Sequence, residues 1–208
     1  MNKKKVLTII FIVILVLIAI FLTSTIRKMI ILKDLNQKVS QYTNSKNYYE
    51  KIINSLGTTA EYYSKENNAV LFLNSNTSSG EKRILKNYFR GNTANTYIES
   101  GNDKQAILNS NGIPGKIKII GLDIPNNLWQ LFTKAVTTSI KTKEYNGKDC
   151  YILDLGNSNE AYLEKETGLR IKAKEGDMTV KYSYEFNNVN DSIFNEPDIK
   201  DYKLQNNK

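Results

Sequence analysis

The side chains that could carry acid–base or nucleophilic chemistry are few in this sequence. The chain of 208 residues has no histidine and a single cysteine, Cys150. A histidine-based catalytic triad, a histidine-ligated metal and an intrachain disulfide are therefore excluded. Cys150 lies in a strand-like run, which favours packing in a core, and an intermolecular disulfide is the alternative. The sequence has neither a G-x-x-x-x-G-K-[ST] nor a G-x-G-x-x-G motif for phosphates.

The remaining polar combinations are weak candidates for a reaction centre. A serine or threonine lies near each of three lysines, Lys65, Lys134 and Lys141. Such neighbours are expected by chance in a chain rich in all three residue types. Three acids could be imagined around a calcium ion, but they lack the spacing of a calcium loop and are better explained as solvated: Asp123, Asp149 and Asp154. The sequence therefore predicts a protein that is not an enzyme and that uses no metal and no cofactor.

The strongest physical signal lies at the N-terminus. From Val6 to Ile26 the chain has 21 consecutive uncharged residues, dense in Ile, Leu, Val and Phe. A helix of that length spans about 30 Å, the thickness of the hydrocarbon core of a bilayer. A cleaved signal peptide is the alternative, but the apolar run exceeds the usual length of about 15 residues, and no A-x-A-like site follows it. We therefore expect a retained membrane anchor over residues 6–26.

The charges beside this segment decide its orientation only weakly. Lys3, Lys4 and Lys5 precede it, and Arg27, Lys28 and Lys33 follow it, so the positive-inside bias is small. A short tail followed by a large polar domain still favours a cytoplasmic N-terminus. We expect a single-pass protein of the cell membrane with a cytoplasmic tail at 1–5, the anchor at 6–26, a juxtamembrane helical linker at 27–40, one extracytoplasmic domain at 41–204 and a frayed tail at 205–208.

The charge of the chain is mildly basic. Its 29 lysines and arginines face 21 acids, and this excess is too diffuse to predict a nucleic-acid partner. Several basic residues lie on or near expected strands: Lys82, Arg83, Lys86, Arg90, Lys165, Arg170, Lys172, Lys174 and Lys181. They are typical of the solvent-facing side of a sheet, and attraction to an anionic membrane or wall polymer is the alternative.

A long amphipathic helix is expected after the anchor. Apolar residues recur at a spacing of three to four from Leu35 to Tyr63, and only Lys46 interrupts them. This pattern predicts a helix over about 34–64, weakened at Gly57. We expect its C-terminal part to pack against the sheet of the domain. A coiled-coil dimer stalk is the alternative, although Lys46 in the seam would make a weak zipper.

From Asn68 onward the period changes to two, which indicates strands. The clearest alternation places a set of apolar residues on one face of a half-buried antiparallel strand: Met178, Val180, Tyr182, Tyr184 and Phe186. Asn146-Gly147 and Glu166-Thr167-Gly168 are expected hairpin turns. We expect strands near 68–74, 82–90, 94–100, 104–109, 115–120, 140–146, 149–155, 159–164, 169–175 and 178–187, joined mostly as hairpins.

One short helix is expected among these strands. Asp123 is its expected N-cap, with Pro125 early in the first turn. One apolar stripe follows, formed by Leu128, Leu131, Phe132, Ala135 and Val136. The order of the elements predicts the α+β class, with one curved antiparallel β-sheet covered by helices on its concave face.

Four stretches follow the strand and turn pattern of a known family. They are Lys82–Gly91, Asn146–Tyr151, Ala161–Lys172 and Val189–Pro197. The third is similar to a strand, D-K-E-T-G-L-P-L-K, strand pattern. Together they resemble the bacterial lipoprotein-carrier superfamily of LolA/LolB-like half-barrels, over about residues 40–204. The resemblance implies an open half-barrel in which a long N-terminal helix and short lid helices plug an apolar cavity for acyl chains. A membrane anchor departs from the soluble carriers, and the arginine that pins their lid has no match here.

The resemblance implies which side chains face the cavity. From the strands these are Leu71, Leu73, Leu85, Phe89, Leu153, Leu155, Leu163, Ile171, Val180, Tyr182 and Tyr184, and from the lid helix Leu128, Leu131 and Phe132. From the residues alone, the same positions fit an ordinary filled core, because a lined cavity and a packed core use the same residue types.

The sequence thus leads to two hypotheses about function. In the first, a membrane-anchored extracytoplasmic domain binds a lipid acyl chain or a lipoprotein by burial of apolar surface, without catalysis. Its partners are that lipid or lipoprotein and its own membrane, through residues 6–26. The alternative is a sensor or interaction module of the same fold, dry inside, that binds a partner protein or an anionic cell-envelope polymer.

Overall fold

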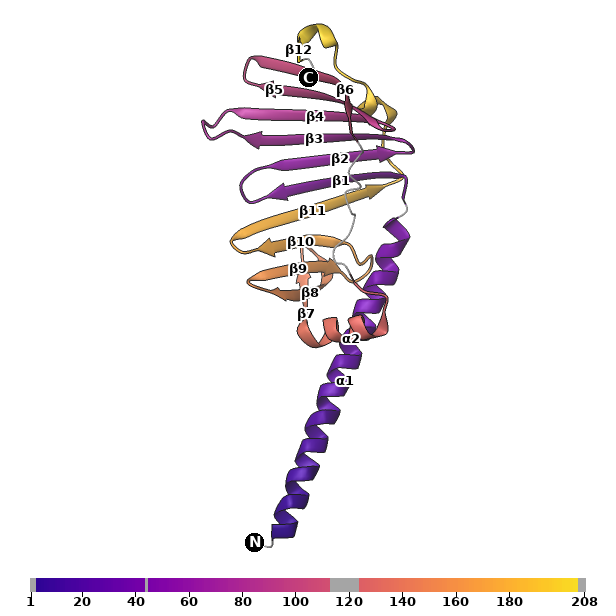
Figure 1. Cartoon of the computed structure of the whole chain (residues 1–208), viewed down its shortest axis with the longest axis vertical. Helices are drawn as coiled ribbons and strands as arrows, with labels where there is room; N and C mark the ends of the chain where they lie inside the picture. The colour runs from indigo at the N-terminus through magenta and orange to yellow at the C-terminus, as the bar shows by residue number, and fades with distance from the viewer. Residues whose placement is uncertain (1–2, 44, 113–123, 206–208) are drawn as a thin grey trace.

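The computed structural model describes residues 3–43, 45–112 and 124–205. Its elements in chain order are α1 (Lys3–Thr43), β1 (Asn47–Asn54), β2 (Thr59–Lys65), β3 (Asn68–Asn76), β4 (Lys82–Arg90), β5 (Thr93–Ser100), β6 (Asp103–Asn111), α2 (Leu128–Thr137), β7 (Ser139–Tyr145), β8 (Lys148–Gly156), β9 (Asn159–Glu164), β10 (Arg170–Glu175), β11 (Met178–Phe186), η1 (Asp191–Phe194), η2 (Ile199–Asp201) and β12 (Lys203–Leu204). The predicted α+β class with an open, curved sheet is confirmed (Figure 1).

Two antiparallel meanders build the sheet. The described strands form one sheet of 12 strands in the order β12-β6-β5-β4-β3-β2-β1-β11-β10-β9-β8-β7. The meanders join where β1 pairs with β11, and there Glu50 lies opposite Tyr184. β12 adds in parallel to β6 at the far edge. The sequence predicted the hairpins but not the central β1–β11 pair, which joins strands from the two ends of the domain.

Helix α1 continues without a break from the apolar segment into the domain. It is long and apolar enough to cross a membrane, and none of its most apolar 18 residues is buried. Farther along, Leu32 and Leu35 are fully buried and Val39 is nearly so. They pack on one face of the sheet, here called the inner face, which carries Tyr48, Tyr62, Ala69, Leu153 and Leu163. The segment expected as a linker at 27–40 therefore contributes to the core.

The prediction that this helix continues to about residue 64 is wrong. Helix α1 ends at Thr43, and β1 and β2 occupy the rest of the segment. The error has a physical reason, because β1 carries large apolar side chains on both faces. Tyr48 and Ile52 alternate with Tyr49 and Ile53, so the apolar residues match a helical spacing although the side chains have a period of two.

The expected weak point of that helix is instead a hairpin turn. Gly57 has a φ of +82°, which a residue with a side chain rarely adopts. The side-chain oxygen of Asn54 accepts hydrogen bonds from the backbone N–H groups of Leu56 and Thr58, at 3.1 and 2.9 Å. This arrangement closes the turn between β1 and β2.

The strands expected from residue 68 onward are confirmed in all cases that the structure describes, β3 to β11, with ends within two residues. The strand expected near 115–120 lies outside the described residues. Helix α2 is also confirmed, but its N-cap is Asn127, whose side chain accepts from the backbone N–H of Trp129 at 2.9 Å. Asp123, the expected cap, lies outside the described residues, and Pro125 precedes the helix. Asn127 supplies the same capping chemistry at the position next to the helix.

The opposite, outer face of β3–β6 is covered by the C-terminal tail. Tyr202 and Phe194 pack there against Val70, Tyr88 and Tyr97. The backbone N–H of Gln205 still donates to the carbonyl of Ala106, at 2.9 Å, so the described part of the tail stays paired to β6.

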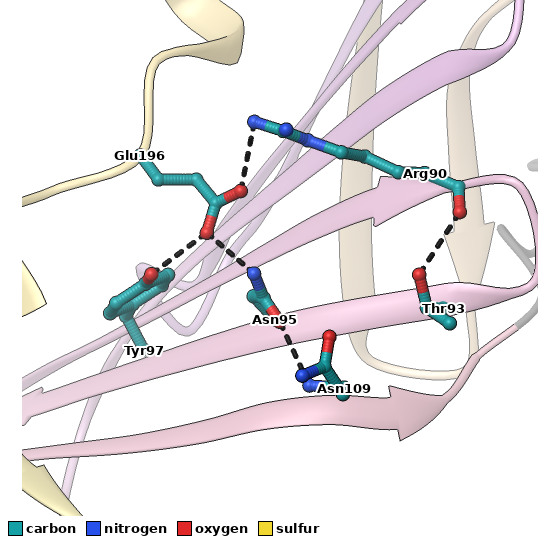
Figure 2. A network of polar contacts seen from close by, with 6 residues as sticks. All are labelled: Arg90, Thr93, Asn95, Tyr97, Asn109 and Glu196. Atoms are coloured by element: carbon teal, nitrogen blue, oxygen red, sulfur yellow. Dashed lines mark hydrogen bonds and ion pairs between the residues drawn. The ribbon is translucent and has the colours of Figure 1, made fainter.

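Glu196 holds this tail to the sheet through a polar network (Figure 2). One carboxylate oxygen accepts from the Tyr97 hydroxyl at 2.8 Å and from the Asn95 amide at 2.7 Å, and the other pairs with Arg90 at 3.0 Å. Asn95 also accepts from the backbone N–H of Asn109 at 2.9 Å, where the register between β5 and β6 shifts. The carboxylate therefore links the tail to three side chains of β4 and β5.

Replacing Glu196 with alanine should release the tail. The Glu196→Ala variant loses all three contacts, and we expect a loss of about 2 kcal/mol of stability, since hydrogen bonds to charged groups contribute about 1.5–3 kcal/mol. Limited proteolysis followed by mass spectrometry should show faster cleavage between residues 187 and 205. The Glu196→Gln variant, which keeps one acceptor oxygen for Tyr97 and Asn95 and loses the ion pair, should cleave at an intermediate rate. Cleavage of Glu196→Ala at the wild-type rate would show that the network does not hold the tail.

Candidate ligand-binding site

The sheet is open between β10 and β11. β11 pairs with β1 from Val180 to Phe186, but it pairs with β10 only from Met178 to Lys181. In β10, the register shifts between Arg170 and Lys172. Beyond these residues β10 and β11 separate, and a pocket of about 480 Å³ lies in the gap. Pockets of about 300–1,000 Å³ are the usual size of small-molecule sites.

The wall of this pocket is largely aromatic and aliphatic. The apolar lining consists of Tyr42, Ile53, Tyr145, Leu169, Ile171, Tyr182, Tyr184 and Phe186. The rings of Tyr42 and Phe186 lie 4.6 Å apart, so the end of α1 closes one side. Because side chains alternate along β11, Tyr182, Tyr184 and Phe186 come from the inner face and Lys181 and Ser183 from the outer face. The pocket therefore lies within the plane of the sheet.

Charged side chains lie at the outer side of the pocket. Lys148 pairs with Glu164 at 2.8 Å, and Lys51 pairs with Glu61 at 2.7 Å. Although burial raises the pKa of Glu164, hydrogen bonds from Lys148 and Thr167 hold it below its usual value. Lys181 is exposed and has no ion pair among the described residues. The charged rim is thus net positive, with three lysines and one acid in the lining.

Two polar residues, Arg170 and the buried Glu50, lie beside the aromatic wall. The guanidinium of Arg170 lies 4.3 Å from the centre of the Tyr182 ring, and the Tyr184 hydroxyl donates to the Arg170 carbonyl at 3.1 Å. Glu50 lies beside them and is only 2% exposed. Burial raises the pKa of Glu50 to about 7, although the nearby Arg170 and Tyr184 act in the opposite direction. One of its carboxylate oxygens has no hydrogen-bond partner among the described residues.

The site residues expected from the sequence are found in three different environments. Ile171, Tyr182 and Tyr184 line the pocket. Leu131, Leu153 and Leu163 form a packed cluster with Leu32 and Leu35 of α1, so these positions belong to a filled core. Val180 is also buried. In this part of the domain the helices fill the space that a cavity would need.

The remaining expected site residues do not line the pocket. Four are half-buried on the inner face of β3 and β4, where Leu73 lies directly opposite Leu85: Leu71, Leu73, Leu85 and Phe89. Leu155 is 39% exposed and Leu128 is 73% exposed, so neither faces an enclosed cavity. Phe132 is half-buried and stacks on Trp129, with 5.7 Å between ring centres. Strand and helix periodicity gave the direction of Leu128 and Leu155 but not what covers them, so their role as cavity residues stays a prediction.

Several pocket residues were missed by the sequence reasoning. Leu169 and Phe186 belong to strands that the sequence predicted, and only the separation of the strands gives them a role. Lys51 and Ile53 were assigned to a helix, so their place beside β11 was not foreseen. Tyr42 was correctly placed on α1 but was not expected to contact Phe186.

The titratable groups near the pocket are mostly buried or paired. Glu50 has a pKa suited to a base, but it is buried and does not line the pocket. Cys150 is fully buried and burial raises the pKa of its thiol, so packing in the core is confirmed for it. Among the described residues, no group of three acidic, histidine or cysteine side chains could hold a metal ion. The apolar wall and the basic rim suit a ligand that has a hydrocarbon part and an anionic group.

The fold defined here is an open half-barrel sheet with helices on its inner face. No protein-family model and no curated protein matches the chain. Among solved structures, the lipoprotein LppX of Mycobacterium tuberculosis matches with 12% identity and a TM-score of 0.43, covering 77% of this chain and 97% of that one. A LolA superfamily protein of Nitrosomonas europaea matches with 11% identity and a TM-score of 0.25, covering 79% and 97%. The second belongs to the superfamily that the sequence resembles. Matches at this level carry no information about a ligand.

Proposed function

We propose that this chain is a single-pass membrane protein whose domain stands outside the cytoplasm and binds the hydrocarbon chain of a lipid or lipoprotein, without catalysis. The pocket between β10 and β11 carries this proposal. Its aromatic and aliphatic wall would bury the hydrocarbon chain, and Lys181 would lie near an anionic headgroup. The helix α1 would hold the site beside the membrane that supplies the ligand.

The length of α1 supports the anchor. The uncharged segment from Val6 to Ile26 matches the hydrocarbon thickness of about 30 Å. Because α1 then continues into the core at Leu32, the domain begins within about 9 Å of the end of this segment. Tyr42, which lines the pocket, lies about 24 Å farther along the helix than Ile26. The site would therefore stand close to the membrane surface.

A matched pair of tryptophan substitutions tests the pocket. Ile53 lines the pocket and is 38% exposed, whereas Leu56 is 77% exposed on the adjacent turn and does not line it. A tryptophan at position 53 should fill part of the pocket. If it displaces about two methylene groups of the ligand, the loss is about 1.6 kcal/mol, or about tenfold in affinity.

The measurement is binding of a fluorescent fatty acid to the full chain in detergent micelles, with mass spectrometry of lipids that copurify. We expect Ile53→Trp to bind about tenfold more weakly than wild type and Leu56→Trp to bind equally. Equal binding by all three proteins would contradict the pocket. Loss of binding in both variants would indicate a general defect in folding. Thermal unfolding of both variants at the same temperature would exclude such a defect.

A further inference from the structure

Helix α2 carries apolar side chains on two faces, and the described residues of the domain cover only one of them. Leu131 and Ala135 are buried against α1 and the sheet. On the outward side, Leu128 and Trp129 are each 73% exposed and Val136 is 39% exposed. Phe132 lies beside them, with its ring stacked on Trp129. These four residues, Leu128, Trp129, Phe132 and Val136, are here called the α2 apolar face. Packing within the domain does not explain them.

The position of α2 on α1 indicates what this face meets. Met29, Ile31 and Leu32 of α1 pack in the same cluster as Leu131 and Ala135. Leu32 follows the last residue of the expected anchor, Ile26, by about 9 Å along the helix. Figure 1 shows α2 at the end of the sheet from which the N-terminal half of α1 extends. If residues 6–26 span a bilayer, α2 lies at the surface of that bilayer.

The charges around α2 agree with this position. Basic residues lie on the neighbouring part of α1, on α2 itself and on the edge strand β7: Arg27, Lys28, Lys33, Lys134, Lys141 and Lys143. Within the part of the chain that the structure describes, none of them is in an ion pair. Two acids lie next to them in the chain: Glu144, exposed on β7, and Asp34 on α1, which pairs with Lys38 at 2.8 Å. A basic side chain near an anionic leaflet contributes about 1 kcal/mol of attraction.

We infer that α2 is an interfacial helix, whose α2 apolar face lies in the headgroup region of the same bilayer that α1 spans. This inference rests on the proposed anchor. Tryptophan favours this region of a membrane, and an amphipathic helix buries its apolar side about 5–10 Å into it. Two contacts, the spanning helix and α2, then fix the orientation of the domain. The sheet rises from the membrane with β7 nearest to it and β12 farthest away.

Trp129 is the only tryptophan in the chain, so its fluorescence reports on this face alone. The full chain is reconstituted into vesicles of phosphatidylcholine and phosphatidylglycerol, with and without bromine on the acyl chains. We expect brominated lipid to remove on the order of half of the emission, because a face about 5–10 Å deep reaches the acyl chains. Aqueous iodide should quench it weakly.

The control moves the tryptophan to the far edge of the sheet. Leu204 on β12 is 61% exposed, and a variant that combines Trp129→Phe with Leu204→Trp should be quenched by iodide and not by brominated lipid. Strong iodide quenching of Trp129 without lipid quenching would overturn the inference. Protection from iodide without lipid quenching would overturn it as well, because a protein such as a second copy would then cover the face. Failure of the chain to float with the vesicles would overturn the proposed anchor too. Flotation therefore distinguishes a wrong anchor from a wrong inference about α2.

Discussion

Replacing Gly168 with alanine should destabilise the domain by about 3 kcal/mol. Gly168 lies in the turn between β9 and β10 with a φ of +74°, where a side chain costs about 1–2 kcal/mol. An added Cβ atom would also meet the backbone oxygen of Leu35 at 2.7 Å and the Cγ2 atom of Val39 at 3.0 Å. Since the Leu35 oxygen belongs to the backbone of a packed helix, either α1 or the turn must move. Thermal or denaturant unfolding of the full chain in micelles, followed by circular dichroism, measures the loss.

Gly176 provides the matched control. It has a φ of +60°, and a Cβ atom built on it meets nothing within 4 Å. The Gly176→Ala variant should therefore lose only the conformational part, about 1–2 kcal/mol. Equal losses in the two variants would show that the close approach of α1 to the turn has no energetic weight. Thr167 and Leu169, the neighbours of Gly168 in the chain, line the pocket. Gly168→Ala should therefore also weaken ligand binding, whereas Gly176→Ala should not.

Replacing Glu50 with glutamine should remove most of the pH dependence of stability between about pH 5 and 7. The pKa of Glu50 is raised by burial from 4.5 to about 7. Between these values the folded chain binds a proton that the unfolded chain has released, so stability falls as pH rises through this window and is constant above it. The ionised carboxylate therefore costs up to about 3 kcal/mol at pH 8. The Glu50→Gln variant avoids this cost and should be more stable than wild type at pH 8.

Unfolding free energies measured from pH 5 to pH 8 test this. Glu185, exposed on the other face of β11, provides a control of equal charge, and Glu185→Gln should keep the wild-type slope. A Glu50→Gln variant with the wild-type slope would show that another group is responsible. A variant less stable than wild type at every pH would show that Arg170 needs the charge of Glu50.

The sequence predicted most strands because apolar and polar residues alternate along them. β11 alternates apolar and polar residues, and the turn at Asn146-Gly147 demands a positive φ, so both were recognisable locally. Strands β1 and β2 could not be predicted in this way, because Tyr48 and Tyr49 place aromatic rings on both faces of β1. The pairing of β1 with β11 is a contact between residues about 130 positions apart in the chain, and no local pattern encodes it.

The candidate site was predicted only in part for a related reason. Apolar periodicity gave the direction of Tyr182, Tyr184 and Leu153 from their strands, but not what lies in front of them. Helix α1 covers Leu153, whereas the separation of β10 from β11 leaves Tyr182 and Tyr184 beside a pocket. The separation begins where the register of β10 against β9 shifts, between Arg170 and Lys172, and such an irregularity has no signature in the residue types.

Photocrosslinking with a lipid that carries a diazirine on its acyl chain tests the central proposal most directly. The full chain is illuminated in membranes that contain this lipid, and the modified peptides are mapped by mass spectrometry. Ligand in the pocket predicts labels at residues 169–171 and 182–186, in addition to those from contact with the bilayer, and Ile53→Trp should reduce them. Labels confined to residues 6–26 and 128–136, or found on β3 and β4 instead, would contradict a lipid site between β10 and β11.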